Sequence, residues 1–164
     1  MKKKNNDRNY IDNDRFLQEL IDYKERLKNN PKERIPEYIG KCILLIANKL
    51  ATRANFSSYT YISEMVDDAI EDMIKAVNNF DPTFSKTKSG KVNPFGYFGM
   101  IAWWAFVQRL AIEKNEQYVK FKNTQNLNLL SPLEGSVFDS TYADQIIGDF
   151  EETLRKKKEK KNVI

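Results

Sequence analysis

The sequence of 164 residues contains no histidine and only one cysteine, Cys42. Without histidine, catalytic triads and general bases that use imidazole are excluded, as are zinc sites that need an imidazole ligand. A single cysteine permits neither an intrachain disulfide nor a CxxC metal site. Because Cys42 lies in the apolar run IGKCILLIANKL, the sequence favours a small buried thiol over a catalytic one.

Long apolar segments are missing too. No apolar run reaches the roughly 18 residues that a membrane helix requires. The N-terminus is charged and polar, without the apolar centre of a signal peptide. There is no glycine-rich phosphate loop, no internal repeat and no β-type alternation of apolar and polar residues. We therefore expect an all-α, soluble, cytoplasmic protein with no membrane contact, cofactor or metal.

The charged residues are unevenly distributed. Lys and Arg number 27 against 23 Asp and Glu, a formal net charge of +4, which by itself is weak evidence for a nucleic-acid partner. Acidic residues are dense in 64–72 and basic residues in 86–91. Patterning predicts three regions: a flexible basic N-terminus (1–11), a compact helical domain (12–122), and a linker with an amphipathic helix and a basic tail (123–164).

Apolar residues at three- and four-residue steps predict the helices. The first is capped at Asp12 or Asn13 and ends before Pro31. The second starts at Pro36, ends near residue 55 and is expected to be central to the core. The third is capped by Ser63. We expect its inward-facing residues to be Val66, Ile70, Met73, Ile74 and Val77.

The third helix carries an unusual concentration of acid. Glu64, Asp67, Asp68, Glu71 and Asp72 lie opposite its expected apolar face. Like charges at this spacing repel by a few tenths of a kcal/mol per pair, offset in part by the positive helix N-terminus. A solvated face is one interpretation, and a docking face for a basic partner is the second. A Mg²⁺-dependent nuclease site made by Asp67, Asp68 and Glu71 is a third, weaker one.

The fourth helix starts at Pro94 and is crowded with aromatic residues. We expect its core face to comprise Phe95, Phe98, Ala102, Ala105, Phe106 and Leu110. A helix in a small domain cannot easily bury rings on all sides, so some should be exposed. Exposed rings beside lysines suit unstacked bases, each worth roughly 1–3 kcal/mol on stacking. The alternative is that all the rings are core.

The stretch from Glu64 to Arg109 resembles a known family. DAIEDMIKAVNNFD, followed by an aromatic helix with a Trp pair and Gln-Arg, is similar to region 2 of bacterial sigma factors. The layout looks closest to the late-transcription sigma factors of T-even-type bacteriophages. This resemblance covers roughly residues 10–154 and is specific over 64–109. It implies a region 2-type helical domain in a promoter-specificity subunit that is not an enzyme.

The resemblance also implies partners. The acidic helix would bind the coiled coil of the RNA polymerase beta-prime subunit, through Glu64, Asp67, Asp68, Glu71 and Ile74. The aromatic helix would recognise and open a TATA-like −10 promoter element and hold the non-template strand. Implied ring platforms are Phe95, Tyr97, Phe98, Trp103 and Trp104. Implied phosphate contacts are Lys86, Lys88, Lys91, Arg109 and Lys114, and Gln108 would read a base edge.

Two further expectations concern partners. Residues 127–164 are expected to contact the polymerase flap region, a sliding clamp or a co-activator. No helix-turn-helix pattern follows the linker, so nothing resembles the domain that reads the upstream promoter element. A generic helical single-stranded DNA-binding protein without a polymerase partner is the alternative function.

Overall fold

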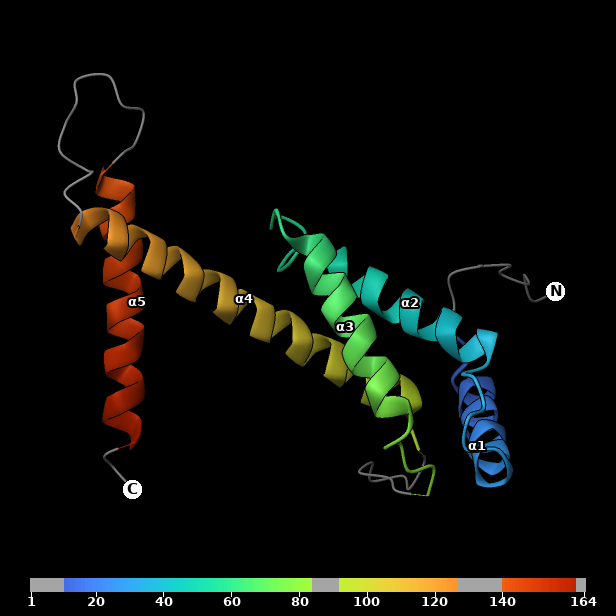
Figure 1. Ribbon diagram of the computed structural model, residues 1–164. Coiled ribbons are helices and arrows are strands. Elements are labelled where there is room, and N and C mark those ends of the chain that lie inside the picture. The colour runs from blue at the N-terminus through green and yellow to red at the C-terminus, as the bar shows by residue number, and fades with distance from the viewer. Residues whose placement is uncertain (1–10, 84–91, 127–139, 162–164) are drawn as a thin grey trace. The chain divides into compact units, whose positions relative to one another are not determined.

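The structure, a computed structural model, describes residues 11–83, 92–126 and 140–161. Within these ranges the regular secondary structure is all helix, with no strand, which confirms the all-α prediction. The helices are α1 (Asn13–Asn29), α2 (Glu37–Ala51), α3 (Ile62–Val77), α4 (Pro94–Asn126) and α5 (Ser140–Lys161) (Figure 1).

The chain divides into two compact units, Met1–Arg109 and Leu110–Ile164. The division falls inside α4, whereas the sequence placed the end of the helical domain at residue 122. No helix in the described ranges is both long enough and apolar enough to cross a membrane.

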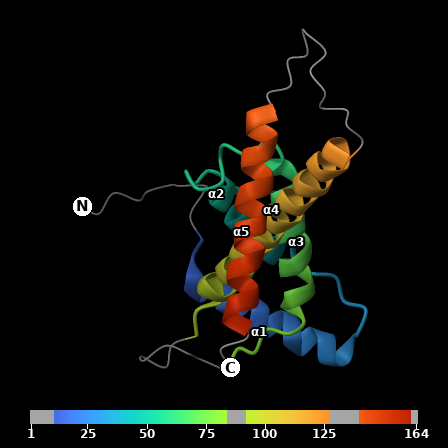
Figure 2. The same ribbon diagram turned by 90° about the vertical axis from the view of Figure 1, so that its left-hand side faces the viewer.

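The start of α1 follows from its cap, as predicted. The side-chain Oδ1 of Asp12 accepts hydrogen bonds from the backbone N–H groups of Asp14 and Arg15, at 3.0 and 3.2 Å. A cap of this kind satisfies N–H groups that have no partner within the helix. The helix then buries Phe16, Leu20 and Tyr23. Lys24 donates to the backbone oxygen of Asn78 at 3.0 Å, which ties α1 to the end of α3. Only the lower end of α3 comes near α1 in Figure 2.

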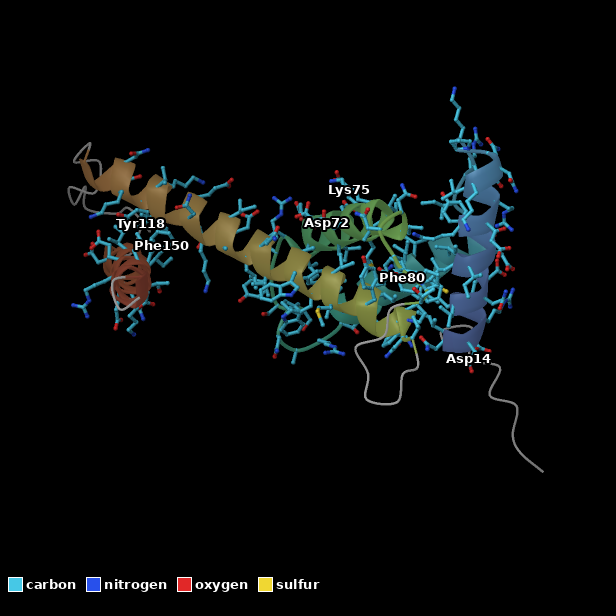
Figure 3. All side chains as sticks on the ribbon, turned by 90° about the horizontal axis from the view of Figure 1, so that it is seen from below. Asp14, Asp72, Lys75, Phe80, Tyr118 and Phe150 are labelled. Atoms are coloured by element: carbon cyan, nitrogen blue, oxygen red, sulfur yellow. The ribbon has the colours of Figure 1, made fainter. Side chains whose placement is uncertain are left out.

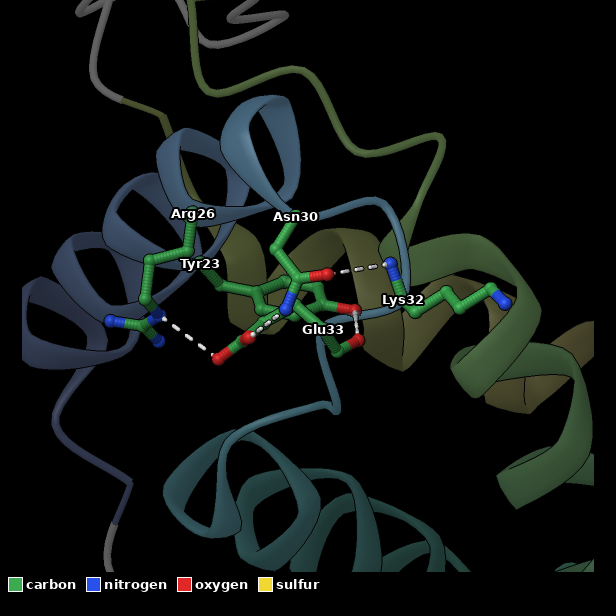
Figure 4. Close-up of polar contacts among 5 residues, drawn as sticks. All are labelled: Tyr23, Arg26, Asn30, Lys32 and Glu33. Carbon is green, nitrogen blue, oxygen red and sulfur yellow. Dashed lines mark hydrogen bonds and ion pairs between the residues drawn. The ribbon is translucent and has the colours of Figure 1, made fainter.

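The turn after α1 is held by polar contacts centred on Glu33 (Figure 4). Its Oε2 accepts from the side-chain amide of Asn30 at 3.0 Å, and its Oε1 lies 3.7 Å from Nε of Arg26. The backbone oxygen of Glu33 accepts from the hydroxyl of Tyr23 at 3.4 Å. The turn leads to Pro36, whose missing N–H costs nothing where α2 begins.

Helix α2 lies at the centre of the first unit, as its apolar pattern predicted. It packs against both α1 and α3. It ends at Ala51 rather than near residue 55, and a series of turns follows. Phe56 points from these turns into the core and is buried. The buried residues of α2 are Ile39, Cys42, Ile43, Ile46, Ala47 and Leu50.

The structure of α3 differs from two predictions, the identity of its N-cap and the position of its buried face. Its first residue is Ile62, and Tyr61 occupies the cap position without a side-chain hydrogen bond, so Ser63 is not the cap. Its buried residues are Met65, Ala69, Met73 and Val77. That face is rotated from the predicted one: it is centred on Ala69 and Met73, whereas Ile74 is turned out and is 44% exposed.

The first part of α4 closes the core of the first unit. The ring of Phe98 packs against Phe16 of α1 at 5.4 Å between centroids and against Phe80, after α3, at 5.8 Å. Phe106 meets the edge of Phe56 at 4.9 Å. Ala102 and Ala105 share this buried face. Phe95 was predicted to belong to it but is 45% exposed, because it lies in the first turn of the helix.

The second unit contains the rest of α4 and α5. The rings of Tyr118 and Phe150 stack at 4.5 Å between centroids (Figure 3). Beside them, the ammonium group of Lys122 lies 2.9 Å from Oε1 of Glu151. Ile147 is buried in α5. The predicted C-terminal amphipathic helix is therefore present, whereas residues 127–139, predicted as linker, lie outside the described ranges.

Candidate functional site

One exposed face of α3 contains most of the predicted docking residues. Glu64, Asp67, Glu71 and Ile74, here named the acidic ridge, are all exposed. Their spacing of three, four and three residues places them on one side of the helix. The ridge is opposite the buried face, and it combines three carboxylates with an exposed apolar side chain. Such a mixture suits a protein partner with a basic and partly apolar surface.

One cation modifies the ridge. The ammonium group of Lys75 lies 2.6 Å from Oε1 of Glu71 and 3.9 Å from Oδ1 of Asp72. Lys75 and Asp72 are both labelled in Figure 3. The hydrogen bond to Glu71 raises the pKa of Lys75. Both side chains of the closer pair are well exposed, so this contact is weak and easily exchanged for another partner.

Asp68, the fifth predicted docking residue, does not lie on the ridge. Its carboxylate accepts two hydrogen bonds from the guanidinium of Arg109 on α4, from Nε at 2.6 Å and from Nη2 at 2.8 Å. Arg109 was predicted to contact phosphate. The structure thus joins two residues that the sequence assigned to different partners, and the pair links α3 to α4 across 41 positions of sequence.

A second exposed face lies on α4. Tyr97, Met100, Trp104 and Gln108, here named the α4 stripe, recur at three- and four-residue steps and are all exposed. Tyr97 is 36%, Met100 63% and Trp104 57% exposed. Two rings and a polarizable thioether on one face form a surface on which flat apolar groups can stack. Sequence reasoning missed Met100, although its spacing from Tyr97 and Trp104 contained the signal.

The other predicted ring platforms have different surroundings. Phe98 is fully buried, so its ring has no face for a base, and the assignment of Phe98 to the DNA surface is corrected to the core. Trp103 is half-buried, with its ring against the edge of Phe56 at 5.0 Å. Phe95 is exposed but lies in the first turn of α4, on a different side from the stripe.

The start of α4 is positioned by two asparagines. Oδ1 of Asn93 accepts from the backbone N–H of Gly96 at 2.9 Å, and Oδ1 of Asn13 accepts from that of Phe95 at 3.2 Å. Pro94 begins the helix as predicted. The ring of Tyr97 then packs edge-on against Phe80 at 5.2 Å. The first residue of the α4 stripe is therefore held on one side while its remaining surface stays exposed.

Within the described residues, the basic side chains predicted to contact phosphate do not form a cluster. Lys86, Lys88 and Lys91 lie outside the described ranges. Lys114 is exposed and belongs to the second unit, and Arg109 is bound to Asp68. Across 11–83, 92–126 and 140–161, no group of three or more Cys, Asp or Glu residues is arranged to hold a metal ion.

No protein-family model matches the chain, and no curated protein matches it in sequence.

Proposed function

We propose that this protein is a promoter-specificity (sigma) subunit of the late bacteriophage type. It binds bacterial core RNA polymerase in the cytoplasm of the host and directs late transcription by recognising and opening a TATA-like −10 promoter element. Two features support the proposal: the likeness of residues 64–109 to sigma region 2, and the presence of two exposed surfaces of different chemistry on neighbouring helices of one unit.

The observation that carries the proposal is the exposure of the α4 stripe. Trp104 is more than half exposed on a helix whose other side buries Phe98, Ala102 and Phe106. Apolar side chains that lie next to one another on an exposed face often mark an interaction site. Separated bases offer a π-face to each ring, and Gln108, at the end of the stripe, has an amide suited to adenine. The acidic ridge on α3 would meanwhile bind the basic face of the beta-prime coiled coil.

The first experiment tests polymerase docking. The purified protein is mixed with bacterial core polymerase, and co-purification is measured for the wild type and for the double reversal Glu64→Lys with Glu71→Lys. We expect the reversal to abolish co-purification, because two attractive charges on the ridge become repulsive. Glu37→Lys, at an exposed glutamate on α2, is the matched control and should co-purify normally. Normal co-purification of the double variant would contradict the docking assignment.

The second experiment tests promoter opening. Wild-type protein and polymerase are added to a TATA-like late promoter, and opened thymines are detected by permanganate. We expect Trp104→Ala and Tyr97→Ala to bind polymerase normally and to reduce opening about tenfold, since each removes one stacking surface. Leu44→Ala, at an exposed apolar residue of α2, is the control. Full opening by both stripe variants would refute this role for the stripe.

A generic single-stranded DNA-binding protein is the second candidate, because the exposed stripe alone would also suit it. That function predicts salt-sensitive binding to any single strand in the absence of polymerase. Fluorescence anisotropy with an unrelated single-stranded oligonucleotide distinguishes the two. Tight binding without polymerase, together with unaffected behaviour of the Glu64 and Glu71 double reversal, would favour the second candidate.

A further inference from the structure

A forked ion pair joins α3 to α4 at the last residue of the first unit. Arg109 contacts both carboxylate oxygens of Asp68, at 2.6 and 2.8 Å. The side chains are 25% and 32% exposed, so water screens the pair less than it screens the contacts on the ridge. A planar guanidinium that binds two oxygens fixes the orientation of its partner, which a single ammonium group cannot do.

The position of the pair determines how α4 is turned. An α-helix advances about 100° per residue. Met100 therefore lies about 180° from Arg109 around the helix axis, and Trp104 about 140° from it, by the same geometry. Because Arg109 points to α3, the α4 stripe points away from α3. The ion pair and the stripe are thus related by the geometry of a single helix.

Ring contacts hold the buried face of α4, and the ion pair can add a directional contact that limits rotation of the helix. Phe98 and Phe106 already hold α4 in the core through ring contacts with three other aromatic residues. Ring contacts tolerate small rotations, whereas a two-point charge-assisted contact is directional. An ion pair of this kind can add little net stability and still specify one arrangement of the helices that it joins.

We infer that Asp68 and Arg109 are positioning residues that set the rotation of α4 on α3, and not contacts for polymerase and phosphate. This inference rests on the proposed function, because the surfaces so positioned are the acidic ridge and the α4 stripe. With the pair in place, a protein bound to the ridge and bases stacked on the stripe are held in a defined relation. Without it, the ridge still binds its partner, but the stripe is presented at a variable angle.

The test compares the wild-type full chain with four variants. Asp68→Asn and Arg109→Gln each break the fork, and the double variant Asp68→Arg with Arg109→Asp exchanges the charges. Asp72→Asn is the matched control: the same substitution one turn further along α3, at a residue 3.9 Å from its nearest cation. Three quantities are measured: the near-ultraviolet circular dichroism of the tryptophans, co-purification with core polymerase, and promoter opening.

We expect the two single variants to bind polymerase normally and to open the promoter about tenfold less, the effect of losing one charge-assisted contact. Their tryptophan dichroism should change, because Trp103 packs against the edge of Phe56 and reports a rotation of α4. The charge exchange should restore both signals, and Asp72→Asn should match the wild type. If the exchanged pair does not fold, Arg109→Lys replaces it: it keeps the charge without the fork and should show both defects.

Each contrary result has a separate meaning. Wild-type protein that neither binds polymerase nor opens the promoter refutes the proposed function, and the dichroism then decides the positioning role alone. Unchanged dichroism and opening in Asp68→Asn and Arg109→Gln would overturn the inference. Loss of polymerase binding with unchanged dichroism would make the pair a docking contact, and loss of helix content would make it a stability element; either result also overturns it.

Discussion

Trp103 packs against the edge of Phe56 at 5.0 Å between ring centroids, whereas the next residue, Trp104, is more than half exposed. A step of one residue turns the side-chain direction by about 100°. Two adjacent, chemically identical side chains therefore have different surroundings, one in contact with the core and one in water.

This difference predicts unequal effects of the two alanine substitutions on stability. Trp103→Ala should lower the free energy of unfolding by about 2 kcal/mol, less than the loss at a fully buried ring because Trp103 is only half-buried. Trp104→Ala should change it by less than about 0.5 kcal/mol, since it removes few contacts. Urea unfolding followed by far-ultraviolet circular dichroism measures both values. Equal destabilisation by the two substitutions would contradict the assignment.

Phe98 should contribute to the stability of the fold and not directly to promoter opening. Phe98→Ala is expected to lower the free energy of unfolding by about 3–5 kcal/mol, because it leaves a cavity between α1, α4 and Phe80. Phe98→Leu refills most of that volume and should recover much of the loss. The check is chemical denaturation of both variants, with promoter opening measured at a temperature where Phe98→Leu stays folded. Defective opening by a fully folded Phe98→Leu would return Phe98 to the candidate DNA surface.

Cys42 should be unreactive in the native protein. The side chain is buried in α2, and burial raises the pKa of its thiol, which disfavours the reactive thiolate. At pH 8 the reaction with Ellman's reagent should be slower than in strong urea by on the order of 100-fold, because the core must open first. Similar rates in native buffer and in urea would show that the site is open in solution.

The ion pair in the second unit predicts a specific pH response. A hydrogen bond from the ammonium group of Lys122 lowers the pKa of Glu151. A carboxyl group whose pKa is lower in the folded than in the unfolded state stabilises the fold above its unfolded pKa. That contribution is lost as the pH falls through the lowered value. Acid should therefore weaken the contact between the second part of α4 and α5, and salt should reduce the effect because both groups are exposed.

Carboxyl titration by nuclear magnetic resonance measures this response. In Lys122→Gln, Glu151 should titrate at a higher pH than in the wild type. Glu152 is the internal control, because its pKa is lowered chiefly by Lys156 and should be unaffected by the substitution. Identical titration of Glu151 in both proteins would show that the pair does not persist in solution.

Much of the helical layout could be predicted because its causes are local. The side-chain cap at Asp12, the proline at the start of α4 and the periodic apolar residues of α2 act within a few residues of chain. The expectation that some rings of α4 stay exposed was also correct, since a helix presents more surface than a small core can cover. Burial of Cys42 followed from the same apolar periodicity.

Other features depended on contacts between distant segments. Periodicity indicates that a helix has an apolar face but defines its centre only within a turn, so the burial of Met65 and Ala69 and the exposure of Ile74 required the packed neighbours. Likewise, nothing in the sequence near residue 68 or residue 109 identifies the other as its partner.

The sequence alone determined the helical class, the position of the acidic helix and the presence of more aromatic residues in α4 than one core face can hold. Local propensity and composition suffice for these properties. Only the tertiary structure decided which rings are exposed, and that Asp68 and Arg109 bind each other. Both outcomes depend on the rotation of α3 and α4 about their own axes, which is set by side chains that meet across 41 positions of chain.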